Sequence, residues 1–192
     1  IHSFDQTIRS KAIKLAHRLD FEQILSINFL PNAVYKPEHC IQSTLAVCDQ
    51  LGFDKKRLMF EVTEAEKITD HAHLKNIFAE YKKHQFLTAI DDFGAGYSGL
   101  NLLAEWQPDI IKLDMNLIRD IDQNKTKQLI VKSILDVCQG LGIQVISEGV
   151  ETRAELAALV DFGVDLFQGY YFAKPLFEGL PAVPDSCFEL TR

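Results

Sequence analysis

Acidic residues recur where strand-like runs of the sequence end. Asn28 ends the first such run, and five carboxylates stand at or near the ends of later ones: Glu61, Asp91, Asp92, Asp114 and Glu148. If these runs are parallel strands of one sheet, their carboxyl ends meet at one edge and the carboxylates lie close together. Like charges held that close raise one another's pKa or recruit cations. Carboxylate and amide oxygens favour hard divalent ions, so the pattern predicts a site for Mg²⁺ or Mn²⁺.

Lys112 is the lone cation among these acidic residues, and it shares a strand face with Asp114 because side chains two apart point the same way. Two ions about 4 Å apart are an arrangement that cleaves phosphoesters. A lysine beside them could orient the attacking water or a phosphate oxygen as a point charge. Taken singly, an acidic residue at a strand end is more often a solvated loop residue, and a strand lysine usually extends to solvent. Only the joint placement favours a catalytic site.

The elements that must position these residues alternate along the chain. Helix-like periodicity is found in five stretches: residues 4–18, 38–50, 70–83, 124–139 and 152–160. Short strand-like runs lie between and after them: residues 24–29, 58–62, 87–91, 110–114, 144–147 and 166–168. Strands that alternate with helices predict an α/β fold with a parallel sheet.

A closed barrel and an open doubly wound sheet are the two candidate architectures. Polar residues end every strand-like run, which favours a ring of strands, as in a (β/α)₈ barrel with its chemistry on the carboxyl-terminal face. An open sheet would gather fewer of them at one site. Such barrels usually take about 250 residues, and this chain has 192 with six strand candidates. We therefore expect a barrel that is incomplete at its amino end.

Composition excludes several classes of protein. The net charge is −7, from 20 Lys and Arg against 27 Asp and Glu, which argues against DNA binding through a basic surface. Residues 1–20 do not show the basic region, apolar region and cleavage site of a signal peptide, and no apolar run approaches the roughly 18 residues that a membrane helix needs. The four cysteines form no C-x-x-C pair, so a thiolate zinc site is not expected and the thiols are interpreted as reduced. We expect a cytoplasmic domain, although the parent protein could be anchored through an upstream segment.

Residues 91–98, with the sequence DDFGAGYS, join the acidic pair to a glycine-containing loop that leads into a helix. Glycine permits a positive φ and a close approach of the backbone to a ligand. As a phosphate-binding loop the pattern alone is weak, because strand-to-helix loops carry glycine routinely. Glu64, three residues after Glu61, is on its own equally well a helix-start residue.

With DDFGAGYS, five further segments resemble the EAL domain family, phosphodiesterases that hydrolyse the bacterial second messenger cyclic di-GMP. They are SINF at 26–29, FEVTE at 60–64, IIKLD at 110–114, SEGVET at 147–152 and FQGYYFAKP at 167–175. The resemblance implies a modified (β/α)₈ barrel whose first strand is antiparallel to the others. It also implies hydrolysis of cyclic di-GMP to linear pGpG with Mg²⁺ or Mn²⁺, two ions in all.

The resemblance assigns roles position by position. Metal ligands are implied at Asn28, Glu61, Asp91 and Asp92, whereas Glu148 completes the second metal site or acts as a base. Lys112 matches the residue that positions the hydrolytic water, and Glu64 matches the residue that tethers the DDFGAGYS loop, which takes part in dimerisation. Positions on the substrate side of the site or behind its ligands are matched by Asp114, Glu151, Gln168 and Pro175.

One part of the family pattern is not in this sequence. The Glu-Ala-Leu segment, whose Glu is a metal ligand on the first strand, belongs upstream of Asn28 by more residues than the chain has. We therefore expect an N-terminally truncated EAL-type barrel over residues 1–180 that lacks its first strand and helix, followed by an irregular tail at 181–192. Such a fragment should be impaired in activity. Sensory or GGDEF modules commonly precede these domains.

Two other functions remain open from the sequence. A catalytically inactive receptor would bind cyclic di-GMP or a protein partner, but such members usually lose ligand residues, which are retained here. A barrel enzyme acting on another phosphoester would explain the carboxylates but not the SEGVET and FQGYYFAKP segments.

Overall fold

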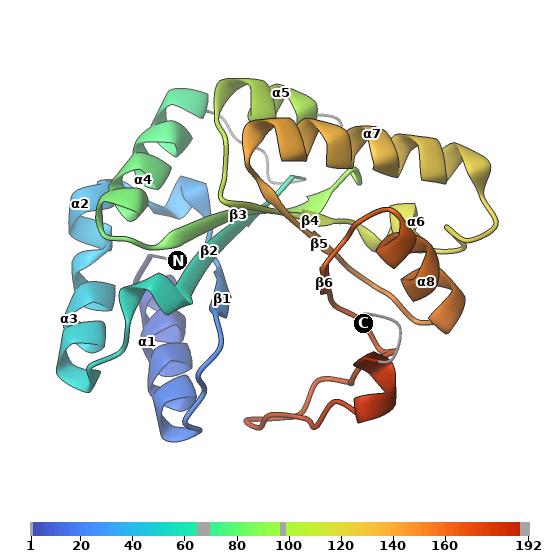
Figure 1. Ribbon diagram of the computed structural model, residues 1–192. Helices are drawn as coiled ribbons and strands as arrows, with labels where there is room; N and C mark the ends of the chain where they lie inside the picture. The colour runs from blue at the N-terminus through green and yellow to red at the C-terminus, as the bar shows by residue number, and fades with distance from the viewer. Residues whose placement is uncertain (1, 65–69, 97–98, 189–192) are drawn as a thin grey trace. The chain divides into compact units, whose positions relative to one another are not determined.

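The computed structural model describes residues 2–64, 70–96 and 99–188 (Figure 1). The chain forms two compact units, Ile1–Ala89 (unit 1) and Ile90–Arg192 (unit 2), and strand β3 (Leu87–Phe93) runs through the boundary. In the part of the chain that the structure describes, no helix combines the length and the apolar character needed to cross a membrane.

Unit 1 pairs two parallel strands with helices that cover them. Strand β1 (Leu25–Asn28) lies in register with β2 (Leu58–Thr63), so that Asn28 stands opposite Glu61 at the carboxyl end of the pair. The remaining elements of this unit are α1 (His2–Arg18), η1 (Pro31–Ala33), α2 (Pro37–Cys40), α3 (Gln42–Leu51), η2 (Lys55–Arg57) and α4 (His71–Lys83). Asp70 caps α4 by accepting the backbone N–H of His73 at 2.9 Å.

The core of unit 1 is aromatic and encloses one cation. Arg9 on α1 is 1% exposed, donates to the Tyr81 hydroxyl at 3.0 Å and pairs with Asp5 at 2.8 Å. Its guanidinium lies 4.9 Å from the ring centre of Phe60 and 5.7 Å from that of Phe29. Side chains alternate along a strand. Since Phe60 and Phe29 point into this core, the neighbouring Glu61 and Asn28 point to the other face of the sheet.

Unit 2 continues the alternation of strand and helix. After β3 it contains α5 (Gly99–Glu105), β4 (Ile110–Leu113), α6 (Met115–Ile118), α7 (Lys125–Leu141), β5 (Gln144–Ser147), α8 (Arg153–Asp161), β6 (Leu166–Phe167) and η3 (Asp185–Phe188). Strand β4 is parallel to β5, with Leu113 opposite Ser147, and β5 is parallel to β6, with Ser147 opposite Phe167. Local signals set the helix ends: Asn124 caps α7 at its start, and Gly142 ends it with a positive φ.

Strand order decides between the two candidate architectures. The six strands form one sheet in chain order, β1-β2-β3-β4-β5-β6. A doubly wound sheet reverses direction at a switch point, for instance in the order 3-2-1-4-5-6, whereas barrel strands follow one another in sequence. The prediction of an α/β barrel-type fold is therefore confirmed.

The expected strands and helices are found, with small differences at their ends. The long helix predicted at 38–50 is divided into α2 and α3. Helix α6 was not predicted, because four residues are too few for a periodic signal. Its cap is readable, since Asp114 accepts the backbone N–H of Asn116 at 2.9 Å. In the tail beyond residue 180, the structure places η3 after an irregular stretch.

Candidate metal and nucleotide site

Lys112 joins two carboxylates in the interior of unit 2. Its Nζ lies 2.9 Å from Asp91 Oδ1 and 2.7 Å from Glu148 Oε1, and all three residues are buried. They come from the ends of neighbouring strands, Asp91 on β3, Lys112 on β4 and Glu148 directly after β5. The predicted gathering of polar side chains at the carboxyl ends of these strands is therefore found.

Asp92 completes an acidic group with Asp91 and Glu148. One carboxylate oxygen from each of the three lies within 4.8 Å of the others. Asp92 has a φ of 53°, and its backbone N–H donates to Asp91 Oδ1 at 3.0 Å. This left-handed conformation lets two successive residues contribute to one group, although successive side chains on a regular strand point to opposite faces.

The pKa of Glu148 is raised above the ordinary value of a glutamate. Burial raises its pKa to about 7, Lys112 opposes that effect, and the negative charge of Asp91 adds to it. A cation beside Glu148 favours its ionised form. The group is therefore suited to binding positive charge, as its residue types predicted.

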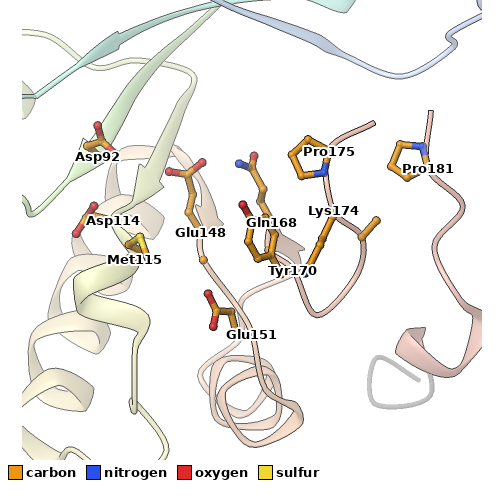
Figure 2. Close-up of a pocket in the computed structure, with 13 residues that line it drawn as sticks. Asp92, Asp114, Met115, Glu148, Glu151, Gln168, Tyr170, Lys174, Pro175 and Pro181 are labelled. Carbon is orange, nitrogen blue, oxygen red and sulfur yellow. The ribbon is translucent and has the colours of Figure 1, made fainter. Parts of the chain in front are cut away.

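A cavity of about 490 Å³ adjoins the acidic group (Figure 2). Figure 2 shows the side chains of Glu148 and Gln168 extending in the same direction, with Pro175 and Pro181 beyond Gln168. The lining consists of Asp92, Asp114, Met115, Glu148, Gly149, Glu151, Gln168, Gly169, Tyr170, Ala173, Lys174, Pro175 and Pro181. All four residues expected on the substrate side are among them: Asp114, Glu151, Gln168 and Pro175.

The wall of the cavity is built by close backbone approach. Gly149 has a φ of 68°, and a Cβ there would meet Met115 Cβ at 2.4 Å. A Cβ on Gly169 would meet the Val150 carbonyl oxygen at 2.0 Å. Val150 donates its N–H to Gln168 O at 3.1 Å, so the segment after β5 and the segment after β6 lie against each other. Both glycines are needed for this packing.

The predicted side chains divide between different tasks. Asp114 Oδ1 accepts hydrogen bonds from the backbone and the side chain of Asn116, so it caps α6 as well as lining the cavity. Glu151 forms a bidentate ion pair with Arg119, at 2.6 and 2.8 Å. Neither Asp114 nor Glu151 belongs to the acidic group of three.

In unit 1, the structure brings two predicted ligands together. Asn28 Nδ2 donates to Glu61 Oε1 at 3.1 Å, across the register of β1 and β2. Glu64 is only 5% exposed, which disagrees with a solvated helix-start residue. The tether that the resemblance implies for Glu64 involves the DDFGAGYS loop, of which Tyr97 and Ser98 lie outside the described residues.

Sequence reasoning missed two residues that contact Glu151, which lines the cavity. Glu155 is 2% exposed and accepts three backbone hydrogen bonds, and Arg119 holds Glu151. A signal for Glu155 was present, since Thr152 and Glu155 have the spacing of a capping box. No sequence signal links Arg119 to Glu151, because their contact depends on how two loops meet.

The sequence matches the EAL domain family over residues 1–175. Barrel-type strand order, strand-end carboxylates and this match agree, and the chain belongs to the EAL domain family. The predicted family is therefore confirmed.

Two relatives from Escherichia coli K12 illustrate the similarity. The cyclic di-GMP phosphodiesterase PdeR is 37% identical over 130 residues, which cover 68% of this chain and 20% of PdeR. The blue light- and temperature-regulated antirepressor BluF is 32% identical over 184 residues, or 95% of this chain and 46% of BluF. The chain thus spans less than half the length of these curated relatives.

Solved structures of EAL proteins are also similar. A standalone EAL protein from Vibrio cholerae O395, in its c-di-GMP-bound form, is 52% identical with a TM-score of 0.92, over 98% of this chain and 78% of that one. BlrP1 of Klebsiella pneumoniae, in a complex with manganese and cyclic di-GMP, is 38% identical with a TM-score of 0.89, over 95% of this chain and 47% of BlrP1.

Proposed function

We propose that this chain supplies the metal-dependent hydrolysis of cyclic di-GMP to linear pGpG. The observation that carries the proposal is the acidic group Asp91, Asp92 and Glu148 at the edge of a cavity of about 490 Å³. The chain belongs to the EAL domain family, and one of its relatives is a cyclic di-GMP phosphodiesterase, which supports the choice of substrate.

The donor set fits a divalent ion. Three carboxylate oxygens within 4.8 Å of one another are hard ligands of the kind that Mg²⁺ and Mn²⁺ prefer. Lys112 already places a positive charge against two of them. Asp91, Asp92 and Glu148 would hold one ion. We also propose Asn28 and Glu61, in unit 1, as metal ligands, and two ions in the functional protein. When bound, such ions polarise the phosphoester and lower the pKa of water.

The cavity has the properties expected of a nucleotide site. Its volume lies in the range of about 300–1,000 Å³ that is typical of small-molecule sites. Tyr170 and Pro175 offer flat apolar surface, Gln168 offers an amide, and Lys174 offers a cation. A dinucleotide with two aromatic bases and two phosphates matches this mixture of groups.

The side chains of unit 2 take separate parts in the proposed reaction. Lys112 lies between Asp91 and Glu148 and contacts both carboxylates through its Nζ. From this position it would orient a water or a phosphate oxygen. Glu148 lines the cavity and contacts Lys112, and we propose that it completes the second metal site or acts as the base. The cavity wall, with Gln168 and Pro175, would hold the substrate so that one phosphodiester faces these groups.

Further parts of the hypothesis concern partners. We propose a homodimer that involves the DDFGAGYS loop, a loop tether at Glu64, and a sensory or GGDEF domain in the same polypeptide. A cytoplasmic location fits a substrate that is a second messenger of bacteria. Light scattering of the purified chain tests the dimer. We expect a mass twice that of the single chain, which is 21.8 kDa.

Binding without turnover is the second candidate. One relative that covers 95% of this chain, BluF, is named an antirepressor and not a phosphodiesterase. Under this candidate the cavity and the acidic group would serve to recognise cyclic di-GMP or to shape a protein-binding surface. The retained acidic group favours the enzyme.

The test is an assay of the purified chain with cyclic di-GMP, in which pGpG is separated by chromatography. We expect slow but measurable release of pGpG with Mn²⁺ or Mg²⁺, because a fragment without the Glu-Ala-Leu segment should be impaired. We expect no pGpG with excess chelator, and a further loss of at least 100-fold in Glu148→Gln. Asp49→Asn, which alters a 66% exposed carboxylate paired with Lys55, is the control and should behave like the unmodified chain. Tight binding with no metal-dependent pGpG would assign the chain to the second candidate.

A further inference from the structure

One buried carboxylate gathers the backbone of two loops. Glu155 Oε1 accepts the N–H of Asp120 at 3.0 Å, and Glu155 Oε2 accepts the N–H groups of Glu151 and Thr152, each at 3.0 Å. Burial favours the neutral acid, yet these backbone hydrogen bonds outweigh it and hold the pKa of Glu155 below its usual value. Glu155 is therefore an ionised acceptor inside the protein.

These bonds exceed what a helix cap requires. A capping box needs the reciprocal pair between Thr152 and Glu155, which is present, with Thr152 Oγ1 accepting the Glu155 N–H at 3.2 Å. The bonds to Glu151 and Asp120 lie outside it. Asp120 has a φ of 57°, and this left-handed conformation costs free energy for a residue other than glycine. The hydrogen bond from its N–H to Glu155 helps to offset that cost.

Both loops that Glu155 joins contribute to one ion pair. Glu151, in the loop after β5, accepts two hydrogen bonds from Arg119, in the turn after α6, at 2.6 and 2.8 Å. Lys127 fixes the same turn by donating to the Arg119 carbonyl at 2.6 Å. The backbones of Arg119 and Glu151 are therefore already anchored. Less further ordering is needed for the two side chains to form their bidentate pair.

The ion pair changes the charge of the cavity. Among the described lining residues, four are acidic, Asp92, Asp114, Glu148 and Glu151, and Lys174 is basic. Asp92 and Glu148 belong to the acidic group that would take a metal ion, but Glu151 lies outside it. Without Arg119, the negative charge of Glu151 would be only partly offset, by Lys174, and would oppose an anionic ligand. Hydrogen bonds from Arg119 lower the pKa of Glu151, so this carboxylate stays ionised.

We propose that Arg119 and Glu155 are positioning residues of the cavity: Glu155 anchors the two loops, and Arg119 neutralises Glu151 and holds it against the wall. The pair would thereby let a wall rich in carboxylates accept a ligand that carries phosphates. This inference rests on the proposed function only for the identity of the ligand, cyclic di-GMP.

Titration calorimetry with cyclic di-GMP tests the role of Arg119. Ca²⁺ replaces Mn²⁺ in these titrations, because its looser coordination is not expected to support turnover. Arg119→Met should raise the Kd about five- to tenfold at low salt, and less at high salt, because the uncovered charge of Glu151 is screened. In the double variant Arg119→Met with Glu151→Gln, the Kd should return to within about twofold of the unmodified chain.

The control is Lys83→Met, which also removes one positive charge from an ion pair with a carboxylate, on the exposed face of α4. It should leave the Kd unchanged. A failure of Glu151→Gln to restore binding, or an Arg119 effect that does not depend on salt, would overturn the neutralising role. If the unmodified chain binds no cyclic di-GMP, the proposed function fails instead, and the two failures are distinct.

A second pair of variants separates anchoring from helix capping. Glu155→Gln removes the charge that accepts three backbone N–H groups, whereas Thr152→Val removes only the hydroxyl that accepts the Glu155 N–H. We expect faster amide exchange at Asp120 and Glu151, and weaker binding of cyclic di-GMP, in Glu155→Gln but not in Thr152→Val. Equal effects in the two variants would mean that Glu155 merely caps α8.

Discussion

Lys112 carries the most direct evidence of function at the scale of single residues. A lysine that is 5% exposed is uncommon unless it is paired, and here Nζ contacts Asp91 and Glu148. The pair of contacts keeps a positive charge where three carboxylates meet, and a divalent ion would bring further positive charge to the same carboxylates. We propose that Lys112 orients a water or a phosphate oxygen once such an ion is bound.

Substitution of Lys112 should affect the chemical step more than binding. Lys112→Met is expected to lower kcat at least 100-fold with little change in KM, since a group that aligns water acts mainly in the transition state. Steady-state kinetics with Mn²⁺ and cyclic di-GMP measure both constants. A normal kcat with a raised KM would instead assign Lys112 to substrate binding.

The stability that Glu155 contributes should depend on pH. Its folded-state pKa lies below that of the unfolded chain, so its contribution is fully present above the unfolded value of about 4.3 and is lost as pH falls through the folded pKa. Glu155→Gln should lower the free energy of unfolding by about 2 kcal/mol at pH 7, as expected for hydrogen bonds to a charged acceptor. Urea unfolding of both proteins from pH 7 down to pH 3 measures the difference.

If that difference between the two proteins stays constant to pH 3, the carboxylate is not ionised in the folded state. Some of these residues could be placed from the sequence, and others could not. Asp91, Lys112 and Glu148 were predictable because strand ends converge in any parallel sheet, whereas the Arg119 contact to Glu151 depends on the path of two loops that no periodicity encodes.

At the scale of elements, close packing of the loops after β5 and β6 shapes the cavity. Gly169→Ala should destabilise the protein by about 1–3 kcal/mol and weaken cyclic di-GMP binding, because its Cβ would lie 2.0 Å from the Val150 carbonyl oxygen. Gly140→Ala is the matched control. Gly140 lies inside α7 with open space where a Cβ would be, so the same change should stabilise the helix by about 1 kcal/mol.

Thermal unfolding of the two glycine variants checks these opposite signs. A Gly169→Ala protein as stable as the unmodified chain would mean that the loops can separate without cost.

The types of the elements were predictable from the sequence because strands and helices differ in the period of their apolar residues. The end of β4 and the start of α6 were harder to predict, since Asp114 serves both as a strand-end carboxylate and as the cap of a four-residue helix.

At the scale of the whole molecule, the strand order was implied by the alternation of elements. Each helix returns the chain to the same end of the sheet, so successive strands are parallel and adjacent, as β4, β5 and β6 are. The presence of one acidic group beside one cavity follows from this topology. The cavity itself was not predictable, because its wall requires the close approach of Gly169 to Val150.

We propose that Asp91, Asp92 and Glu148 bind a divalent ion beside the cavity of unit 2. The most direct measurement is the anomalous scattering of manganese in crystals of the chain grown with Mn²⁺. We predict an anomalous peak within about 2.5 Å of oxygens from these three carboxylates, with the Lys112 to Glu148 contact of 2.7 Å rearranged. Fully occupied manganese elsewhere, with this contact intact and no peak at the acidic group, would contradict the claim.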